Sequence, residues 1–582
     1  MSKQKKSGNT AKAVQEVKTA AGEKKTTGAK ATLAGAESAR IHQRFDRITG
    51  TLMTIYVLFY LCIFPLATHD KYFDILKFRF QLYWIPTLIY GILFLVLGIL
   101  YLIADKRENG GALTAKLKEN LKWNVLKTKL TKTDICFIAL IFIMALSVLF
   151  ADYQYEALWG SRGRFNGLVL WLMFFIAYWL VTRFYHFRKW HLYAYLIAAC
   201  LPEIWGIADF FLLDLFGFHE GVNPQYIYTF VSSVGNINTY TNMIALHMGA
   251  SVAVFVLAKD RIDTLVSGIS LLSASFAIVM GMSDNGLLAV AATFVIVPFV
   301  GWKSRRNICN FFIVLSIFFT IVAITAYLTI GRTTMENGGV SILIMVGKTK
   351  VFHVLAVFLW MFTGTVCWGL HIKKYERGTK GVHCAKMMWT IFIAIGIVGA
   401  LIVLADANMG NHQEIWKPYQ SILVFNDAWG TGRGIIWRFA LEFFTQKSSI
   451  LDKLIGNGPD TFYIITMDYF KKAMKAAGDV FYDSVHNEYL EYLVTIGILG
   501  TIAYISLLVT SLHHMLKKSK NEYAIACGVA VFTYAVQAVV NIAIPITTPI
   551  LMMLLYVGIS IAKESADGQT ETEKMETESY EI

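Results

Sequence analysis

Long apolar runs alternate with short polar segments along most of the chain. A run of about 18 to 20 apolar residues crosses the hydrocarbon core of a bilayer as one helix, in which every backbone polar group is satisfied internally. Runs of this kind begin near Thr51, Leu82, Asp134, Gly167, His191, Tyr240, Ile262, Gly286, Ile308, Val351, Met387, Glu488, Tyr523 and Thr547. The pattern predicts an all-α, polytopic integral membrane protein with about 14 transmembrane helices, one long extracytoplasmic loop and negligible strand.

The polar segments divide this pattern into five parts. Both ends are polar and poor in large apolar residues, which predicts disorder. No signal-peptide core precedes the first apolar run, so we expect that run to remain as a helix. The expected parts are a basic cytoplasmic tail (1–45), an N-terminal transmembrane bundle (46–405), an extracytoplasmic catalytic loop (406–486), C-terminal transmembrane helices (487–563) and an acidic tail (564–582).

The long polar segment is too long for a simple connection, and loops of this length are usually functional or disordered. Arg433–Lys447 mixes aromatic and charged residues over the length of a helix and is suited to the membrane interface. Asp460–Val480 could form a second helix. Gly456-Asn457-Gly458-Pro459 predicts a turn between them.

Composition narrows the class of protein and its orientation. The chain is 56% hydrophobic with a formal net charge of +13. Its Lys and Arg residues lie mostly in short loops, which indicates orientation in a membrane rather than binding to nucleic acid. The loop charges predict that both termini are cytoplasmic and that the outer segments include 152–166 and 217–235. The seven cysteines form no C-x-x-C pair, so neither a disulfide framework nor a zinc site is expected.

His486 is the first candidate for chemistry, because it stands where the long polar segment enters an apolar run. A histidine can accept and return a proton near neutral pH. Asp483 is close enough in sequence to orient the ring. The alternative is an interfacial histidine without catalytic function, with Asp483 and Ser484 capping the following helix.

Four arginines could hold an anion on the same side. Arg433 and Arg438 lie five residues apart, and arginine forks suit phosphate oxygens. Their alternative is to extend along the membrane surface. Arg162 and Arg164 lie among glycines in an outer loop, where positive residues are disfavoured. For them the alternative is a structural salt bridge to Glu156 or Asp152.

Two further features are polar groups at helix ends. Gly235-Asn236-Ile237-Asn238 opens an apolar run; such helix N-termini bind anions, although Asn is also an ordinary cap. Glu203 and Asp209 lie in or near another run, and acids inside a membrane are candidate functional residues.

The order of short motifs resembles that of the O-antigen ligase superfamily, which includes O-antigen polymerases and bacterial protein O-oligosaccharyltransferases. The resemblance covers roughly Ala151 to Ala562 and rests on order and topology. In chain order the motifs are Arg164-Phe165-Asn166-Gly167, Gly235 to Asn238, Gly432-Arg433, Trp437-Arg438, Gly456 to Gly458, His486-Asn487, and Gly497-Ile498-Leu499-Gly500.

The resemblance implies a membrane glycosyltransferase that moves a glycan from undecaprenyl pyrophosphate to a hydroxyl of a glycan, lipid or protein, outside the membrane, without a metal or other cofactor. By resemblance, His486 would be the base or would orient the acceptor, and Arg433 and Arg438 would hold the pyrophosphate leaving group with Arg162 or Arg164 assisting. We therefore expect three catalytic residues, His486, Asp483 and Arg433. The expected substrate-binding residues are Arg438, Arg162, Arg164, Asn236 and Asn487. The other expected partners are membrane lipids.

The sequence departs from the family at one place. The family often has Ser-Arg-Gly at the start of a middle helix, whereas this chain has Ser283-Asp284-Asn285-Gly286. The competing class is a transporter or flippase of lipid-linked sugars, which would use charges near the middle of the membrane. The candidate charges here cluster in outer segments instead, which favours an enzyme.

Overall fold

The computed structural model describes residues 39–108, 110–339, 341–372, 379–410, 412–476, 478 and 480–580. Most of the expected disordered tail at 1–45 lies outside the described residues. The last helix, α26 (Thr548–Tyr580), extends into the acidic segment 564–582, whose disorder stays a prediction.

The chain forms two compact units. The first contains the described residues of 39–53 and 89–131, with α3 (Ala112–Asn120) and α4 (Trp123–Lys129). Within it, the Asp105 carboxylate accepts the Leu113 N–H at 2.9 Å, and Phe45 stacks on Tyr101. Helix α2 (Ile75–Glu108) belongs to both units.

The second unit contains residues 54–88 and 132–582. Its helices before the long polar segment are α5 (Lys132–Phe150), α6 (Gln154–Trp159), α7 (Leu168–Phe184), α8 (Lys189–Ala198), α9 (Cys200–Phe210), α10 (Ile237–Leu257), α11 (Arg261–Met280), α12 (Asn285–Gly301), α13 (Arg305–Leu328), α14 (Ile342–Gly347), α15 (Lys350–Ile372) and α16 (Thr379–Met409). The following α-helices are α17 (Gln413–Trp416), α18 (Gln420–Leu423), α19 (Trp429–Glu442), α20 (Ile450–Ile455), α21 (Phe462–Tyr469), α22 (Lys471–Ala476), α23 (Glu488–Thr495), α24 (Gly497–Leu512), α25 (Glu522–Gln537) and α26.

Short 3-10 and π turns complete the helical structure of this unit. They are η1 (Phe59–Ile63), η2 (Phe64–Leu66), η3 (Ile227–Thr229), η4 (Met335–Gly338), η5 (Lys417–Tyr419), η6 (Phe443–Lys447), η7 (His513–Lys518) and η8 (Ala538–Val540). The strands of the described residues are β1 (Phe230–Val231) and β2 (Gly235–Asn236), which pair antiparallel.

The predicted fold class is confirmed. Among the described residues, 12 helices are long and apolar enough to cross a membrane, and two shorter apolar helices, Leu168–Phe184 and Asn285–Gly301, accompany them. Together they correspond to the fourteen apolar runs of the sequence.

The run expected to begin near Glu488 differs in detail, because α23 and the spanning helix α24 are separate. The break falls at Gly497, whose φ is 68°. A Cβ there would meet the Leu454 backbone at 2.4 Å, so α20 approaches the break too closely for any side chain. The expected helix Asp460–Val480 is likewise divided, into α21 and α22.

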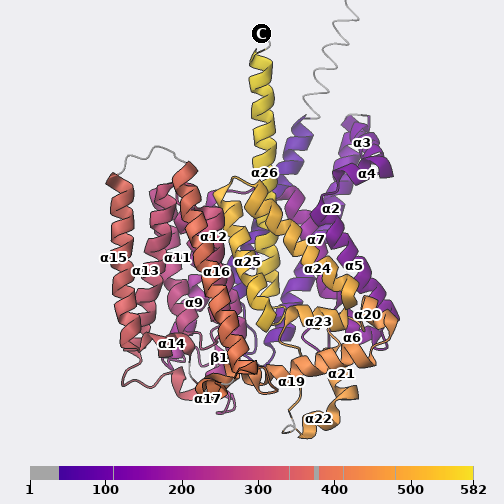
Figure 1. Ribbon diagram of the computed structural model, residues 1–582. Coiled ribbons are helices and arrows are strands. Elements are labelled where there is room, and N and C mark those ends of the chain that lie inside the picture. The colour runs from indigo at the N-terminus through magenta and orange to yellow at the C-terminus, as the bar shows by residue number, and fades with distance from the viewer. Residues whose placement is uncertain are drawn as a thin grey trace, which may run out of the picture. The chain divides into compact units, whose positions relative to one another are not determined.

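Helix α10 forms the centre of the second unit and is buried on nearly every face. Small residues bring it close to α25: a Cβ on Gly249 would lie 2.9 Å from the Ala530 Cα. Figure 1 shows that α6, β1, α17, α19, α21 and α22 lie together at one end of this unit, opposite the C-terminal end of α26. The three segments that we expect outside the membrane therefore share one end.

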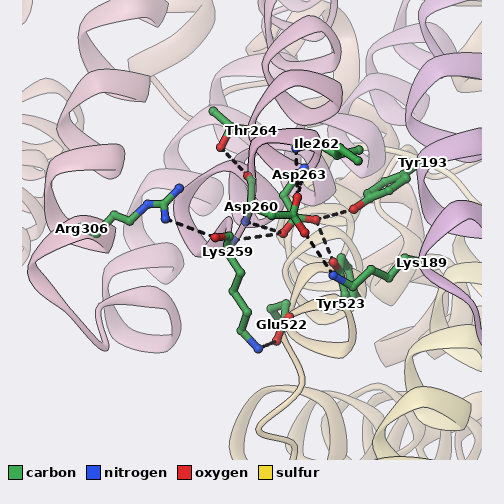
Figure 2. A network of polar contacts seen from close by, with 10 residues as sticks. All are labelled: Lys189, Tyr193, Lys259, Asp260, Ile262, Asp263, Thr264, Arg306, Glu522 and Tyr523. Atoms are coloured by element: carbon green, nitrogen blue, oxygen red, sulfur yellow. Dashed lines mark hydrogen bonds and ion pairs between the residues drawn. The ribbon is translucent and has the colours of Figure 1, made fainter.

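A polar network ties α8, α11, α13 and α25 together at the start of α11 (Figure 2). Its centre is Asp263, which is 1% exposed. The carboxylate accepts hydrogen bonds from the Tyr193 and Tyr523 hydroxyls at 2.6 and 2.8 Å and from two backbone N–H groups of the preceding turn. Around it, Lys189 pairs with Asp260 and Lys259 with Glu522.

Replacing Asp263 with alanine should destabilise the protein, because two tyrosine hydroxyls and two backbone donors would lose a charged acceptor. We expect a loss of at least about 3 kcal/mol, since hydrogen bonds to charged groups are worth roughly 1.5–3 kcal/mol each. Thermal unfolding of the purified protein in detergent would measure it. The neighbouring half-buried Thr264, whose hydroxyl donates to the Asp260 carbonyl, provides the control T264A. Equal unfolding temperatures for the two variants would contradict the central role of Asp263.

Candidate functional site

A glycine-rich loop wraps around one buried carboxylate. Asp460, 9% exposed, accepts the backbone N–H groups of Arg164 and Asn166 at 2.7 and 2.9 Å. A Cβ on Gly160 would lie 2.4 Å from one carboxylate oxygen, and a Cβ on Gly163 would lie 2.5 Å from the other. The glycines of this loop are therefore required by the close approach of Asp460, which joins the loop between α6 and α7 to the turn between α20 and α21.

Arg164 connects the same loop to the segment before His486. Its guanidinium donates to the Asp483 carboxylate at 2.8 Å, and its Nε is buried with no hydrogen-bond partner among the described residues. Two of the predicted site residues, more than 300 positions apart in the sequence, are thus in direct contact.

The backbone around His486 is held by contacts on both sides. The Trp437 indole donates to the Val485 carbonyl at 3.1 Å, and the Glu491 carboxylate accepts the Val485 N–H at 2.7 Å. His486 itself has a φ of 55°. A residue other than glycine in this conformation costs free energy and persists where its surroundings fix it, which is common at functional sites.

The segment that carries these residues has its own hydrophobic core. Val485 packs in a buried cluster with residues of α19, η6, α21 and α22 and with Phe470 between the last two helices. The members from these four elements are Ile436, Phe439, Ala440, Phe443, Phe462, Ile465 and Met474. The helix expected over Arg433–Lys447 is observed as α19 and η6, and it buries its apolar face in this cluster. The cluster fixes α19 against the His486 segment and so positions Arg433 relative to His486.

Arg433 begins the regular part of α19. Gly430, Thr431 and Gly432 before it have φ values of 61°, 60° and 93°, so the chain turns sharply there. The Arg433 guanidinium donates to the Gly430 carbonyl at 2.8 Å, and its Nε is buried without a partner among the described residues. Arg433 forms no salt bridge with any of the described residues. Burial lowers the pKa of Arg433, and the charge of Asp284 raises it.

The imidazole of His486 lies in a positive environment. Burial lowers the pKa of His486 to about 4, and the charges of Arg433 and Arg164 act in the same direction. The Asp483 carboxylate opposes them with a smaller effect. At neutral pH the imidazole is therefore uncharged, and its free lone pair can accept a proton.

Two buried carboxyl groups of the site, those of Asp460 and Glu491, have raised pKa values. Burial raises the pKa of Asp460 to about 7, against the lowering effect of the two backbone donors. Burial also raises the pKa of Glu491 to about 8, and Asp460 and Asp483 add to the shift. These groups therefore exchange protons near neutral pH.

The other predicted arginines have acidic partners. Arg438 forms a bidentate pair with Asp427 at 2.9 and 2.8 Å on the exposed side of α19. Arg162 is 3.4 Å from Glu156, which is the structural salt bridge weighed for it from the sequence. Neither guanidinium is among those that shift the His486 pKa, so the contributions of Arg438 and Arg162 to substrate binding stay predictions.

Both predicted asparagines act as helix caps. The Asn236 side chain accepts the Asn238 N–H at 2.8 Å at the start of α10. Asn487 accepts the N–H groups of Tyr489 and Leu490 at the start of α23. Asn487 therefore caps this helix, and the alternative that Asp483 and Ser484 cap it is wrong. The imidazole of His486 donates no hydrogen bond to Asp483 among the described residues, and the Asp483 carboxylate pairs with Arg164 instead.

Sequence analysis missed Asp460 and Glu491. Asp460 follows the Gly456–Pro459 turn directly, and a φ of 63° at an aspartate is the structural feature that distinguishes it. Asp284, noted only as a departure from the family, interacts with Arg433. Next to it, the Asn238 side-chain carbonyl accepts hydrogen bonds from Ser283 and Asn285.

Fold and site together define a polytopic α-helical membrane protein with a cationic site at one end of its bundle. Residues 339–505 match the family model of the O-antigen ligase domain. This range contains Arg433, Arg438, Asp460, Asp483 and His486. This region is therefore similar to the O-antigen ligase domain, and it lies in a chain whose helices are those of a multi-pass membrane protein. No curated protein shows a significant match to the chain.

Replacing Asp460 with alanine should loosen the 160–167 loop, because the Arg164 and Asn166 amides would lose their acceptor. Hydrogen exchange of that loop should become faster, and Arg164 should hold Asp483 less firmly. Asp468→Ala is the matched control, since Asp468 accepts only the Tyr153 hydroxyl on an exposed face. Unchanged exchange in D460A would show that the loop is held by other contacts.

Proposed function

We propose that this protein transfers a glycan from undecaprenyl pyrophosphate to an acceptor hydroxyl at the membrane surface. The observation that carries the proposal is the uncharged, partly buried His486 beside the guanidinium groups of Arg433 and Arg164. A transfer of this type needs a base for the hydroxyl proton and a cation for the departing diphosphate, and the site contains both.

In the proposed reaction the acceptor oxygen attacks the anomeric carbon of the glycan, and its proton passes to the His486 imidazole. The bond from the anomeric carbon to the diphosphate oxygen breaks, and the diphosphate leaves on its lipid with the bonding electrons. Arg433 and Arg164 stabilise the charge that develops on the leaving group. Asp483 positions Arg164 rather than the imidazole.

Binding of the donor would also make the imidazole of His486 more basic. A diphosphate near the two guanidinium groups offsets their effect on His486, so the imidazole becomes more basic when the donor is bound. The His486 imidazole therefore accepts a proton more readily in the donor complex than in the free protein. This limits protonation of His486 when no donor is bound.

The remaining assignments follow from the same proposal. The end of the bundle that carries His486 faces away from the cytoplasm, and both termini are cytoplasmic, as the loop charges predict. The donor is a lipid-linked oligosaccharide, and the acceptor is a glycan, lipid or protein. The competing proposal, transport of lipid-linked sugars, has one supporting observation: Glu203 and His247 form a buried pair at 2.6 Å within spanning helices α9 and α10.

His486→Ala should abolish transfer while leaving donor binding in place. Loss of a general base typically costs about 10²–10⁴-fold in rate. The measurement is release of undecaprenyl pyrophosphate by the purified protein supplied with lipid-linked glycan and candidate acceptors, beside a direct donor-binding assay. A transporter would lose little in H486A, so equal donor flux in H486A and the wild type would favour that class.

Arg433→Ala should weaken both donor binding and transfer, because its buried guanidinium has no carboxylate partner in the described part of the chain other than the nearby Asp284 charge. We expect a smaller effect for Arg438→Ala, whose side chain is already paired with Asp427. Lys472→Ala removes an exposed positive charge from the same segment and is the control. A loss in K472A as large as in R433A would mean that general surface charge, not a defined site, attracts the donor.

The pH dependence of transfer should reflect the effect of the Arg433 and Arg164 guanidinium groups on the pKa of His486. Because the pKa of free His486 is lowered to about 4, kcat/KM should show no acid-side loss from this group above about pH 5. In Arg433→Gln the His486 pKa should rise, so the acid-side loss should move to higher pH. Identical profiles for R433Q and the wild type would exclude His486 as the base in this environment.

A further inference from the structure

A second polar cluster lies where α9 ends and the chain turns toward β1. It contains Asp209 in the last turn of α9 and Asp214 and His219 in the following loop. One carboxylate oxygen of each aspartate and one imidazole nitrogen all lie within 4.8 Å of one another. Ligands of one metal ion are separated by at most about twice the metal–ligand distance, roughly 4–5 Å. The three groups are therefore close enough to share a cation.

The hydrogen bonds of His219 leave one nitrogen available. Its Nε2 is 2.9 Å from the Phe230 carbonyl oxygen, which can only accept, so Nε2 carries the hydrogen. In the neutral ring Nδ1 then presents a lone pair, 3.5 Å from an Asp214 oxygen. Metal-binding histidines are commonly oriented by this type of bond from the other nitrogen to a backbone carbonyl. Two lone pairs facing each other need a proton or a cation between them.

Asp209 supplies an independent observation. The residue is 1% exposed, and one carboxylate oxygen accepts the Ser232 N–H at 2.6 Å. The other oxygen is buried and forms no hydrogen bond of normal geometry among the described residues, although the Trp205 indole N–H interacts with it. An incompletely satisfied buried carboxylate oxygen is costly, and a bound cation would satisfy it.

The negative charges of the two aspartates are also not balanced by a lysine or arginine in the described part of the chain. Neither Asp209 nor Asp214 forms a salt bridge with a lysine or arginine in the described part of the chain, and the neighbouring Lys71 pairs with Glu220 at 2.9 Å. Two carboxylates thus face one imidazole. Asp214 is exposed, which gives an ion a path from solvent.

We propose that Asp209, Asp214 and His219 bind one divalent cation. Two carboxylates with one imidazole suit Mn²⁺ or Zn²⁺ better than Ca²⁺ or Mg²⁺, which prefer oxygen ligands alone. Water would fill the remaining positions. The ion would join the end of α9 to the loop and, through Ser232 and Phe230, to the β1–β2 turn that leads into Asn236 and α10. Its role is to fix this loop, and it takes no part in the transfer step.

A second group of possible metal ligands, Cys200, Glu203 and His247, differs because its polar groups already have hydrogen-bond partners. The ring nitrogens of His247 already bond Glu203 on one side and the Leu196 carbonyl and Ser270 on the other. The second Glu203 oxygen accepts the Ser273 hydroxyl, and the Cys200 thiol donates to the Leu196 carbonyl. Its polar groups are satisfied without an ion, so it is a hydrogen-bonded network within the helices.

The test is metal binding by the full chain, purified in detergent and stripped with a chelator. Mn²⁺ binding is followed by electron paramagnetic resonance and Zn²⁺ binding by calorimetry. We expect one saturable site per chain in the wild type and affinity lower by about tenfold or more in His219→Ala and Asp214→Asn. The control is His69→Ala, because His69 forms an isolated pair with Asp74 at 2.9 Å without a third ligand.

Thermal unfolding gives a second measurement that does not depend on glycan transfer. Saturating Mn²⁺ or Zn²⁺ should raise the unfolding temperature of the wild type and of H69A, and not that of H219A. The proposal is overturned if the stripped wild type binds neither metal saturably, or if H219A and D214N bind as the wild type does. In either case the cluster is an ion pair of Asp214 with a protonated His219.

Discussion

The arrangement of the site depends on the carboxylate of Asp460. It accepts the backbone donors of Arg164 and Asn166 and lies so close to Gly160 and Gly163 that neither can carry a side chain. This one group holds the loop between α6 and α7 against the turn that follows α20. Arg164 is thereby positioned to contact Asp483, and the segment ending at His486 is joined to a part of the chain more than 300 residues earlier. A buried carboxylate that replaces water with backbone donors can do this because its own desolvation is partly offset by those bonds.

The site combines features that are unfavourable for stability and useful for binding an anion. Arg433 and Arg164 each have a buried Nε without a hydrogen-bond partner in the described residues, and both depress the pKa of His486. His486 and Asp460 have positive φ values. In the proposed reaction a diphosphate would satisfy the arginine donors and relieve the effect on the imidazole. The hydrophobic cluster around Val485 supplies the stability that keeps these groups in place.

The sequence predicted the helical architecture well, because an apolar run of sufficient length has few alternatives in a membrane. It also selected Arg164, Asp483, Arg433 and His486, which the structure brings together. It could not assign partners, since pairing depends on contacts distant in sequence. Arg433 and Arg438 cannot be told apart in the sequence, because both belong to one predicted helix. In the structure Arg438 pairs with Asp427, whereas Arg433 follows three residues with left-handed backbone conformation. Asp460 was missed because a single acid after a turn has no distinctive pattern until the glycines that surround it are seen in space.

The acid at position 284, where the resemblance noted from the sequence led us to expect arginine, is consistent with this charge arrangement. Asp284 raises the pKa of Arg433 and accepts the Ile342 N–H at 3.1 Å, while Ser283 beside it donates to Asn238. An arginine at this position would place a second positive charge beside Arg433 and oppose its protonation. With aspartate, each of the two site arginines has an acid within electrostatic range: Asp483 and Asp460 for Arg164, and Asp284 for Arg433. A bound diphosphate would then compete with these acids for the guanidinium groups, so release of the product is favoured by the same carboxylates that stabilise the free site.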